Sequence, residues 1–515
     1  MSYAKDVNIG ENESLYMLKI PHPYYLCSAE QSRFMDEKTI TEFGIDGFTL
    51  MEIAGTRAAD FIMSEIPANS HGVFFCGKGN NGGDALVIAR LLSQQDFNIT
   101  VCFLSGTEDL SPDADKNFRL LQKLETDIQV LKWEDFTPED YDFIADGMLG
   151  TGLNTEVRAL YSDAIEYINK QKAPVFSLDV PTGLNADTGQ IMGSAVQSDF
   201  TLSFGALKIG FYLNEGFDTA GEVILCELSF PNKYKNPASY LIDEEWVDAN
   251  SPSREKKKHK YDGGVLYIIA GSEGLTGAAV LAAKSAWSTG LGAVVLITPK
   301  GLLEVYEKQL VQIIKKPIGD HDDVYFKESH LADVLEVLKE KPGKLLIGPG
   351  IGRHEETIRF TQKLLTAFEG DSLIDADALF ALSKWENWDI PDSSDLILTP
   401  HPGELKSLLN KELSNDHERM EAVITFAKQN GLTILSKGMP SIVGTESGVP
   451  YLTGYDTRVF SRAGFGDVLA GKTGAFWLKY SSAELACFQA LLNGYKGSKQ
   501  YFATNSGSLE PMDII

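Results

Sequence analysis

The sequence predicts an α/β protein with two domains, each built on a parallel sheet that helices cover on both faces. The chain of 515 residues is long enough for two or three domains. Continuous apolar runs of strand length alternate with amphipathic helical segments, which is the pattern of parallel sheets buried on both faces. The alternation stops near residues 231–262 and restarts after Gly263, which indicates two separate units.

Composition and charge indicate a globular protein and argue against some kinds of partner. Apolar residues make up 43% of the chain and charged residues 23%, as in globular proteins with sizeable cores. The net charge of −26 argues against a nucleic-acid backbone or an anionic membrane as the main partner. The five cysteines show no zinc or redox spacing, which favours buried thiols in a reducing compartment. The polar start of the chain and the lack of any apolar run of bilayer length lead us to expect a cytoplasmic protein.

The first half is interpreted as an irregular extension over 1–25 and a domain over 26–235. Apolar residues recur at helical spacing from Glu30 to Ile62, with a break at 44–47. Apolar runs predict strands at 73–76, 98–104, 128–131, 141–146, 174–180, 198–204 and 221–228. Amphipathic segments predict helices at 84–95, 112–125 and 159–171.

A turn-rich and basic segment separates the two halves. We expect a solvated linker over 236–258, which includes the basic run 253–258, whereas His259 and Lys260 could face a phosphate. The second domain is expected over 259–510. Its predicted strands are 264–270, 292–298, 344–348, 372–376, 394–399, 432–436, 440–445 and 449–453. Its predicted helices are 276–289, 355–368, 403–410, 416–430, 466–480 and 482–502.

A glycine-rich stretch after the first of these strands dominates the first half. It reads Cys76-Gly77-Lys78-Gly79-Asn80-Asn81-Gly82-Gly83-Asp84 and joins an apolar run to a helical pattern. Glycines let backbone N–H groups turn toward a ligand, and a helix N-terminus favours an anion. An ordinary strand-to-helix turn, in which Asp84 only charges the first helical turn, is the alternative. The density of glycines and amides favours a binding loop.

Three further loops of the first half follow strands and carry polar groups. They are 144–152 with Asp146, 178–183 with Asp179 and Thr182, and 204–210 with Lys208. Ligands of open α/β sheets gather at the carboxyl ends of the strands. Such oxygen-rich loops suit a hard monovalent cation or a polar sugar-phosphate ligand. The absence of a His or Cys cluster gives no support to a transition-metal site.

The second half has its own motifs at strand ends. They are the glycine loop 347–352, the acids Asp375 and Asp377, the helix start 399–404 with His401, and 436–438 with Lys437. The run Gly464-Phe465-Gly466-Asp467 opens a helix and predicts an anion-binding nest with a carboxylate beside it. Such a nest would stabilise a transferring phosphoryl group while Asp467 accepts a hydroxyl proton. A helix-capping role for Asp467 is the alternative.

Four motifs of the first half occur in one characteristic order. They are Asn80-Asn81-Gly82-Gly83-Asp84, Asp146 with Gly150-Thr151-Gly152, Asp179-Val180-Pro181-Thr182-Gly183, and Phe204-Gly205 with Lys208-Ile209-Gly210. Together with Met51-Glu52-Ile53-Ala54-Gly55, they closely resemble the NAD(P)HX epimerase family, or YjeF N-terminal domain, over about 25–230. The resemblance implies a Rossmann-like parallel-sheet sandwich that interconverts the R and S epimers of hydrated NADH and NADPH.

This resemblance implies roles for individual residues. Asp179 is the expected acid/base group, and Lys208 is a secondary candidate. Asn81, Asp146 and Thr182 would hold a potassium ion, with Thr182 where the family usually has Ser. Contacts with the dinucleotide are implied for Asn80, Asn81, Gly82, Gly83, Asp84, Gly150, Thr151, Gly152, Leu153, Asn154, Thr155, Glu156 and Asp179. The family's loop after Gly152 often carries Arg-Gly, from which 153–156 differs.

The motifs of the second half resemble the YjeF C-terminal domain, the NAD(P)HX dehydratase of the ribokinase-like superfamily, over about 255–500. In that family a nucleotide phosphorylates the ring hydroxyl of the S epimer, and phosphate elimination then regenerates NADH or NADPH. The resemblance implies that Asp467 is the base and that Asp375 and Asp377 orient Mg²⁺. The hydrated dinucleotide would contact Ala278, Gly352, His401 and Asp467. The nucleotide would contact Lys437, Gly438, Met439, Pro440, Ser441 and Gly466.

The second half departs from the family pattern close to this site. Ala463 and Phe465 replace a Gly and the Ser of a Gly-Gly-Ser-Gly-Asp run, 454–458 differs from Gly-Asn-x-Gly, and Asn493 stands where the family has His. We expect a bifunctional repair enzyme of the bacterial type, which generally uses ADP, and a homo-oligomer. The alternatives are a small-molecule kinase and an epimerase whose second domain only binds a nucleotide. The choice between ADP and ATP stays open.

Overall fold

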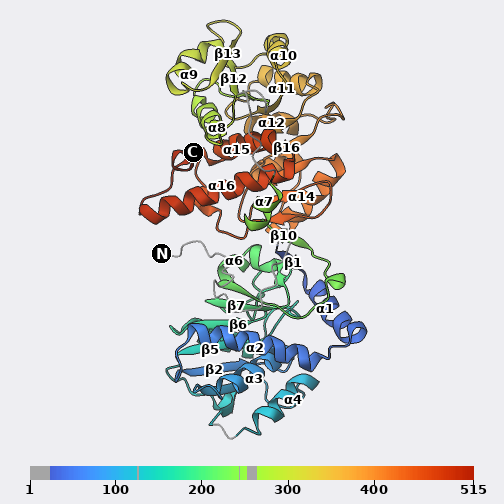
Figure 1. Cartoon of the computed structure of the whole chain (residues 1–515), viewed down its shortest axis with the longest axis vertical. Helices are drawn as coiled ribbons and strands as arrows, with labels where there is room; N and C mark the ends of the chain where they lie inside the picture. The colour runs from blue at the N-terminus through green and yellow to red at the C-terminus, as the bar shows by residue number, and fades with distance from the viewer. Residues whose placement is uncertain (1–23, 125–126, 243, 252–263) are drawn as a thin grey trace. The chain divides into compact units, whose positions relative to one another are not determined.

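The chain folds into two compact α/β units, Met1–Leu241 and Ile242–Ile515, in a computed structural model (Figure 1). The structure describes residues 24–124, 127–242, 244–251 and 264–515. The expectation of two α/β domains is confirmed. Most of the extension expected over 1–25, the basic run 253–258, and His259 and Lys260 lie outside the described residues.

A seven-stranded parallel sheet forms the centre of the first unit, in the order β4-β3-β2-β5-β6-β7-β9. Each of its strands overlaps a strand that the sequence predicts. The strands are β2 (His71–Cys76), β3 (Asn98–Phe103), β4 (Gln129–Lys132), β5 (Phe143–Gly147), β6 (Val175–Leu178), β7 (Phe200–Phe204) and β9 (Glu222–Cys226).

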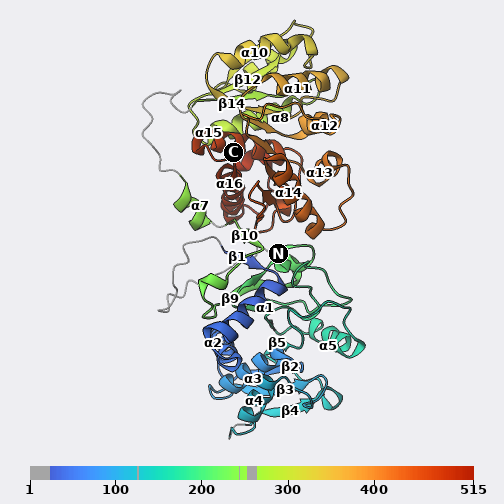
Figure 2. The same cartoon turned by 90° about the vertical axis from the view of Figure 1, so that its right-hand side faces the viewer.

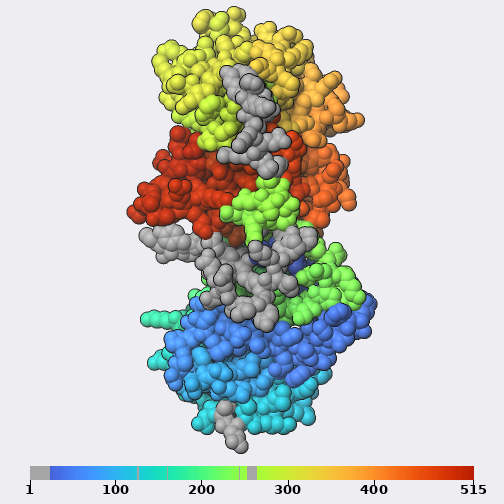
Figure 3. Space-filling model, viewed as in Figure 1, coloured from blue at the N-terminus to red at the C-terminus, as the bar shows by residue number. Residues whose placement is uncertain are grey.

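Helices cover both faces of this sheet (Figure 2). Figure 3 shows the blue atoms of the early part of this unit at the molecular surface. On one face lie α2 (Gly47–Glu65), α3 (Asn80–Leu92) and α4 (Pro112–Leu121), and on the other lies α5 (Ala159–Asn169). Phe74 in β2 packs in the core beneath α2 and α3, and its neighbour Phe75 packs in the core beneath α5. Successive side chains of a strand point to opposite faces, so a strand covered on both sides must be apolar throughout.

Short elements complete the first unit. The strand β1 (Tyr25–Cys27) pairs with β10 (Ser239–Leu241) and β8 (Leu207–Lys208). These strands are too short to show a periodic pattern, and the sequence does not predict them. The helices are α1 (Ala29–Lys38), the π-helix η1 (Thr39–Phe43) and α6 (Gly216–Thr219).

The strands of the second unit follow the order β13-β12-β11-β14-β15-β16-β17-β18-β19. They are parallel from β13 to β17 and antiparallel from β17 to β19. The sequence misses β13, because this edge strand carries Lys315, Lys316 and Pro317 instead of an apolar run. The strands are β11 (Val265–Ile269), β12 (Val294–Pro299), β13 (Ile314–Ile318), β14 (Gly343–Ile347), β15 (Ser372–Ile374), β16 (Leu396–Leu398), β17 (Thr433–Ser436), β18 (Ile442–Gly444) and β19 (Tyr451–Leu452).

The helices of the second unit include several short ones that the sequence does not predict, among them α7, α9, α10 and α12. The segment 236–258, expected as a linker, contains β10 and α7 in its described part. The helices are α7 (Glu244–Asn250), α8 (Thr276–Ser288), α9 (Leu303–Gln309), α10 (Leu331–Lys339), α11 (Glu355–Ala367), α12 (Ala376–Ser383), α13 (Pro402–Leu409), α14 (Asp416–Asn430), α15 (Phe465–Tyr480) and α16 (Ala483–Thr504). Within the described ranges, none of the helices combines the length and apolarity needed to cross a bilayer.

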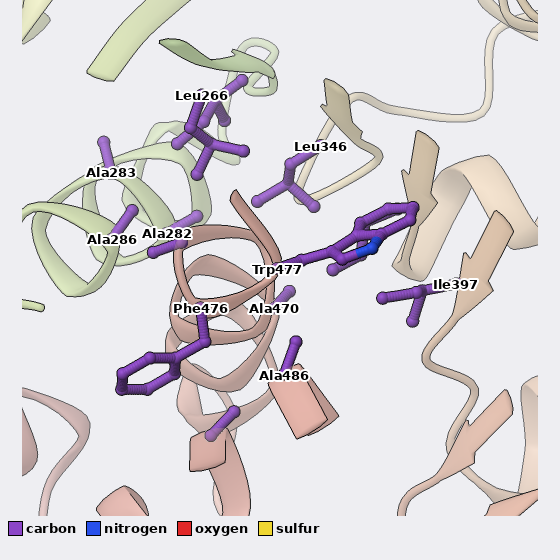
Figure 4. Packing of buried hydrophobic residues seen from close by; sticks show 14 of the residues in the cluster. Leu266, Ala282, Ala283, Ala286, Leu346, Ile397, Ala470, Phe476, Trp477 and Ala486 are labelled. Carbon is purple, nitrogen blue, oxygen red and sulfur yellow. The ribbon is translucent and has the colours of Figure 1, made fainter. Parts of the chain in front are cut away.

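Helix α15 is held in place by close packing against α8 and the sheet (Figure 4). Trp477 points toward Leu346 of β14 and Ile397 of β16. At Gly471 a Cβ atom would lie 2.2 Å from the carbonyl oxygen of Ala282, so a glycine is needed where α15 crosses α8. This packing fixes the N-terminus of α15, which carries Asp467.

Candidate active sites

The glycine-rich stretch of the first unit lies largely inside a helix. The sequence predicts the helix from residue 84, whereas α3 begins at Asn80. Its glycines are poor helix formers, so helix propensity does not predict this first turn. At Gly82 a Cβ atom would lie 2.1 Å from the carbonyl oxygen of Gly77, so tertiary packing demands glycine there. The N–H groups of this first turn can therefore face an anion.

A buried polar cluster lies at the ends of β5 and β6. The Asp146 carboxylate is inaccessible to solvent and accepts hydrogen bonds from the Thr182 hydroxyl at 2.6 Å, the Thr182 N–H at 2.8 Å and the Ser177 hydroxyl at 2.9 Å. Burial raises the pKa of Asp146, although these hydrogen bonds oppose the shift. The Asn81 amide donates to the carbonyl oxygen of Leu149 at 3.0 Å, and the N–H of Leu149 donates to the Thr182 hydroxyl at 2.9 Å.

The side-chain oxygen of Asn81 is buried and has no hydrogen-bond partner among the described residues. Buried polar atoms in native proteins are usually satisfied, so this atom points to a missing ligand. The Asn81, Asp146 and Thr182 oxygens are the kind of donors that a hard monovalent cation prefers. The residues that the resemblance implies for potassium are thus brought together and fit such an ion.

Asp179 stands directly after β6 in a left-handed backbone conformation, with φ of 62°. This conformation is sparsely populated by residues other than glycine and is often found at functional sites. One carboxylate oxygen accepts hydrogen bonds from the Lys208 ammonium and from the N–H of Phe204 at 3.2 Å. Lys208 is 1% exposed and also donates to the Ser203 hydroxyl at 3.1 Å. Lys208 therefore orients Asp179.

The binding loop and Asp179 meet at the same edge of the sheet. A Cβ atom placed on Gly150 would lie 3.6 Å from the amide carbon of Asn81 and 3.7 Å from the free carboxylate oxygen of Asp179. Burial raises the pKa of Asp84 well above its ordinary value, and the charges of Asp179 and Asp36 raise it further. Asp36 on α1 is a contributor that the sequence does not reveal, since it reads as one more polar residue of an exposed helix.

The rest of the predicted dinucleotide contacts form the rim of this edge. Asn80 is exposed, and its side-chain oxygen accepts a hydrogen bond from the Ser111 hydroxyl at 2.8 Å. The loop after Gly150 runs partly or fully exposed through Thr151, Gly152, Leu153, Asn154, Thr155 and Glu156. Gly83 packs against the Met51 side chain of α2.

The second unit contains a cavity of about 530 Å³ at the N-terminus of α15. It brings together many of the residues that the sequence analysis selects for this half. They are Asp375, His401, Lys437, Gly438, Met439, Ser441, Gly466 and Asp467. Ala278, Gly352 and Pro440 lie outside its lining.

The charges of this cavity converge on Lys437. Its ammonium lies 2.8 Å from an Asp375 carboxylate oxygen and 4.0 Å from a Glu404 oxygen. Burial opposes the charge of Lys437, but the two carboxylates outweigh burial and raise its pKa. A Cβ atom on Gly466 would lie 3.4 Å from the Lys437 ammonium, so the lysine head lies beside the turn that opens α15.

Asp467 has an electrostatic environment suited to proton transfer. Burial and the nearby Asp375 carboxylate raise its pKa from 3.8 to about 7, Lys437 opposes the shift, and Asp377 and Glu404 add to it. A carboxyl with a pKa near the working pH can both accept and release a proton. Asp467 is a candidate general base.

Phe465 leaves the nest open, although it is bulkier than the Ser of the family pattern. Gly464 has φ of +97°, and the Phe465 side chain is buried in an apolar cluster with Val468, Leu509 and Ile514. The ring also meets the edge of Phe460, with ring centroids 5.4 Å apart. The aromatic substitution is thus accommodated by residues near the C-terminus.

His401 has a structural role in addition to lining the cavity. Its Nδ1 accepts hydrogen bonds from the N–H groups of Gly403 at 3.0 Å and Glu404 at 3.3 Å, so the imidazole caps α13. With Nδ1 as acceptor, the neutral ring carries its proton on Nε2. Gly352 lies elsewhere: its N–H donates to Asp377 at 3.1 Å, and the same carboxylate accepts from Arg353 at 2.7 Å.

Three side chains that the sequence analysis does not select support the cavity. Arg419 is 4% exposed and donates to the Pro440 carbonyl at 2.7 Å, which braces the turn 437–441. The Thr457 hydroxyl donates to the Gly438 carbonyl at 2.5 Å. Lys472 donates to the Asn493 side chain at 2.6 Å, and burial lowers its pKa to about 8. Lys472 could have been found from the sequence, because it is a charged residue on an otherwise apolar helix face.

The site of the second unit has the groups of an enzyme that transfers a phosphoryl group. A glycine nest at a helix N-terminus, a buried lysine and a carboxyl with a pKa near 7 are the groups that phosphoryl transfer to a hydroxyl requires. The first unit combines a helix N-terminus, a cluster of side-chain oxygen atoms and an oriented carboxylate, as in a small-molecule site at a sheet edge.

Comparison with known proteins gives the family. The family model described as YjeF-related protein N-terminus matches residues 47–210, and the model described as NAD(P)H-hydrate dehydratase matches residues 266–515. The bifunctional NAD(P)H-hydrate repair enzyme Nnr of Salinibacter ruber is 33% identical over 493 residues, which cover 91% of each chain. The corresponding enzyme of Moorella thermoacetica is 31% identical over 460 residues, or 87% of each chain. The chain belongs to the family of bifunctional NAD(P)H-hydrate repair enzymes.

Two solved structures align with about half of the chain. An ADP/ATP-dependent NAD(P)H-hydrate dehydratase from Bacillus subtilis, co-crystallised with ATP and Mg²⁺, is 23% identical. It aligns with 53% of this chain and 94% of its own, with a TM-score of 0.46. A ribokinase-like superfamily protein from Enterococcus faecalis is 17% identical, aligns with 52% of this chain and 89% of its own, and has a TM-score of 0.46.

Proposed function

We propose that the first unit interconverts the R and S epimers of hydrated NADH and NADPH. We propose further that the second unit dehydrates the S epimer to NADH or NADPH at the expense of ADP or ATP. The observation that carries the proposal is the position of Asp467, whose pKa is raised to about 7, beside the glycine nest and Lys437. The family to which the chain belongs supports the pairing of the two activities.

In the second unit Asp467 accepts the proton of the ring hydroxyl as that oxygen attacks the terminal phosphorus of the nucleotide. The bond from this phosphorus to the bridging oxygen breaks, and the nucleotide leaves one phosphate shorter. The N–H groups at the start of α15 and the Lys437 ammonium stabilise the charge on the transferring phosphoryl group. Phosphate then leaves the ring carbon with its bonding electron pair. Loss of a proton from the adjacent carbon forms the ring double bond.

A magnesium ion in this site would neutralise phosphate charge. The Asp375 carboxylate already accepts hydrogen bonds from Thr399 at 2.7 Å and from Lys437, and Asp377 is engaged by Gly352 and Arg353. In the part of the chain that the structure describes, no group of three or more His, Cys, Asp or Glu side chains is arranged to hold a metal. The residues therefore fit an ion held mainly by nucleotide phosphates and water, as is usual for Mg²⁺.

In the first unit Asp179 moves the proton, and Lys208 keeps its carboxylate in place. Asp84, whose pKa is raised, can retain a proton at the same edge of the sheet. Asn81, Asp146 and Thr182 would hold a potassium ion, which would satisfy the free oxygen of Asn81. The N–H groups at the start of α3 face the pyrophosphate of the dinucleotide.

The test is incubation with mixed epimers of hydrated NADH and either ADP or ATP, followed by chromatography and a phosphate assay. Consumption of both epimers, with NADH and phosphate released in equal amounts, is expected. A phosphorylated product without NADH would instead indicate the small-molecule kinase. Consumption of the S epimer alone, limited by spontaneous epimerisation, would show that the first unit is inactive. A homo-oligomeric state and a cytoplasmic location stay predictions.

A further inference from the structure

The interior of the second cavity carries an excess of negative charge. Its lining contains three carboxyl groups, those of Asp375, Glu404 and Asp467, and two lysines, Lys437 and Lys472. Lys437 is paired with Asp375 and lies near Glu404. Their mutual repulsion is visible in the pKa of Asp467, which Asp375 and Glu404 both raise. A polyphosphate entering this cavity adds further negative charge, so positive groups at its rim would stabilise the bound state.

Two arginines line this rim, and they differ in their partners. The Arg458 guanidinium donates to both carboxylate oxygens of Asp456, at 2.9 and 2.8 Å, which neutralises its charge. Arg462 is exposed and lines the same cavity. Among the residues that the structure describes, no carboxylate lies within ion-pair distance of Arg462. Arg462 therefore offers an uncompensated positive charge to the cavity.

The loop that carries Arg462 is anchored at both ends. On one side, the Thr457 hydroxyl ties it to the Gly438 carbonyl of the turn 437–441. On the other side, the N–H of Phe465 donates to the Arg462 carbonyl at 3.4 Å, and the Phe460 and Phe465 rings pack edge to face. Arg462 thus lies on a short, fixed span between the turn assigned to the nucleotide and the nest at the start of α15.

We propose that Arg462 forms a phosphate-binding subsite for the nucleotide at the rim of the second cavity. The proposal rests on the proposed function, which places the nucleotide in this cavity. A guanidinium presents a planar fork of N–H donors that matches phosphate oxygens. The nucleotide is favoured over the pyrophosphate of the hydrated dinucleotide, because the loop is tied to the turn 437–441 and not to the Gly352 loop, which lies outside the cavity lining.

The test is calorimetric titration of the full chain with ADP and with ATP, in the presence of Mg²⁺. We expect Arg462→Ala to raise the nucleotide Kd about tenfold, equivalent to about 1.4 kcal/mol. Arg462→Lys keeps the charge without the fork, and we expect a smaller rise of about threefold. The matched control is Arg359→Ala on α11, an exposed arginine that is paired with Glu328 and does not line the cavity, and it should leave the Kd unchanged.

Steady-state kinetics separate the two possible sources of phosphate. The proposal predicts that the KM for the hydrated dinucleotide changes less than twofold in Arg462→Ala. An unchanged nucleotide Kd would overturn the proposal, and so would a rise in the dinucleotide KM alone, which would assign Arg462 to the other ligand. Wild-type binding of nucleotide without any turnover of the hydrated dinucleotide would overturn the proposed function, while the Kd comparison would still decide the subsite.

Discussion

The hydroxyl of Thr182 donates a hydrogen bond of 2.6 Å to the buried carboxylate of Asp146. Asp146 is the next-to-last residue of the strand β5, and Thr182 lies in the loop after the neighbouring strand β6, so adjacent parallel strands bring the two residues together. The bond satisfies a carboxylate that is inaccessible to solvent and holds the Thr182 oxygen beside Leu149, whose carbonyl oxygen binds the Asn81 amide.

Thr182→Val tests this relationship. It removes the hydroxyl and leaves the buried Asp146 carboxylate short of a donor, so we expect a loss of about 1–3 kcal/mol in unfolding free energy. The potassium dependence of epimerisation should disappear as well, because one oxygen ligand is lost. Thr182→Ser is the matched control and should keep both. Denaturant unfolding and rates with and without potassium make the measurement; an unaltered potassium response in the valine variant would contradict the assignment.

Asp179→Asn should reduce the rate of epimerisation at least about 100-fold, because an amide cannot exchange the proton that the reaction moves. Dehydration of the S epimer by the same protein should be unaffected, since Asp467 belongs to the other unit. This second activity serves as an internal control for folding. The measurement is chromatographic separation of the epimers over time in the absence of nucleotide. A variant that epimerises at the wild-type rate would remove Asp179 from the mechanism.

The pH dependence of the dehydratase should report Asp467. The group acts as a base when ionised and its pKa is about 7, so kcat/KM for the S epimer should rise with pH through about 7 and level off above it. The profile should be measured with saturating nucleotide, by NADH absorbance. Asp467→Asn should lower the rate at least about 100-fold at every pH. A profile that is flat between pH 5 and 9 in the wild type would exclude this role.

Asp467 should also affect the stability of the fold. Activity needs its ionised form, whereas stability favours its protonated form. Its pKa is raised in the folded protein from 3.8 to about 7, so the folded state favours the protonated form. The contribution of this group to stability is complete below about pH 4, falls as pH rises to about 7, and stays low above that. Asp467→Asn should therefore raise the Tm relative to the wild type at pH 8 and make little difference at pH 4. Calorimetric scans at both values test this, and equal Tm differences at the two would argue against a buried, destabilised carboxylate.

Phe465→Ser restores the small residue that is typical of the family but should be destabilising in this chain. The Phe465 ring fills the cluster with Leu509 and Ile514, and truncating a buried aromatic side chain costs about 3–5 kcal/mol. Phe465→Leu keeps most of the buried apolar surface and should cost less. Denaturant unfolding of the two variants gives the comparison. If the serine variant proves as stable as the wild type, the ring does not hold the C-terminal residues in place.

The fold class was predictable because parallel sheets covered on both faces demand apolar strands, and a central strand such as β2 shows a continuous apolar run. The edge strand β4 is largely exposed and shows only a short one. The strands that were not predicted are those that are not covered on both faces or are very short. The edge strand β13 carries lysines, and β1, β8 and β10 are too short to show a period. Helix α3 begins at Asn80, before its predicted start. The prediction missed this turn because glycines disfavour a helix, whereas the close approach of Gly82 to Gly77 requires a glycine there.

The sequence by itself determined which residues are candidates for the chemistry. Asn81, Asp146, Asp179 and Thr182 stand at strand ends, and the chain order of parallel strands places strand ends at one edge. The same logic selected Lys437, Gly466 and Asp467, which the structure brings to one cavity. It did not separate these from Ala278 and Gly352, which the structure places outside that cavity's lining.

Only the tertiary structure decided the state of those groups. The pKa of Asp467, the pairing of Lys208 with Asp179, and the unpaired charge of Arg462 depend on burial and on neighbours far away in the chain. The burial of the Phe465 ring likewise depends on Leu509 and Ile514, which follow the helix α16 in the sequence. Electrostatic and packing energies depend on distances in space, which a one-dimensional pattern of residue types does not contain.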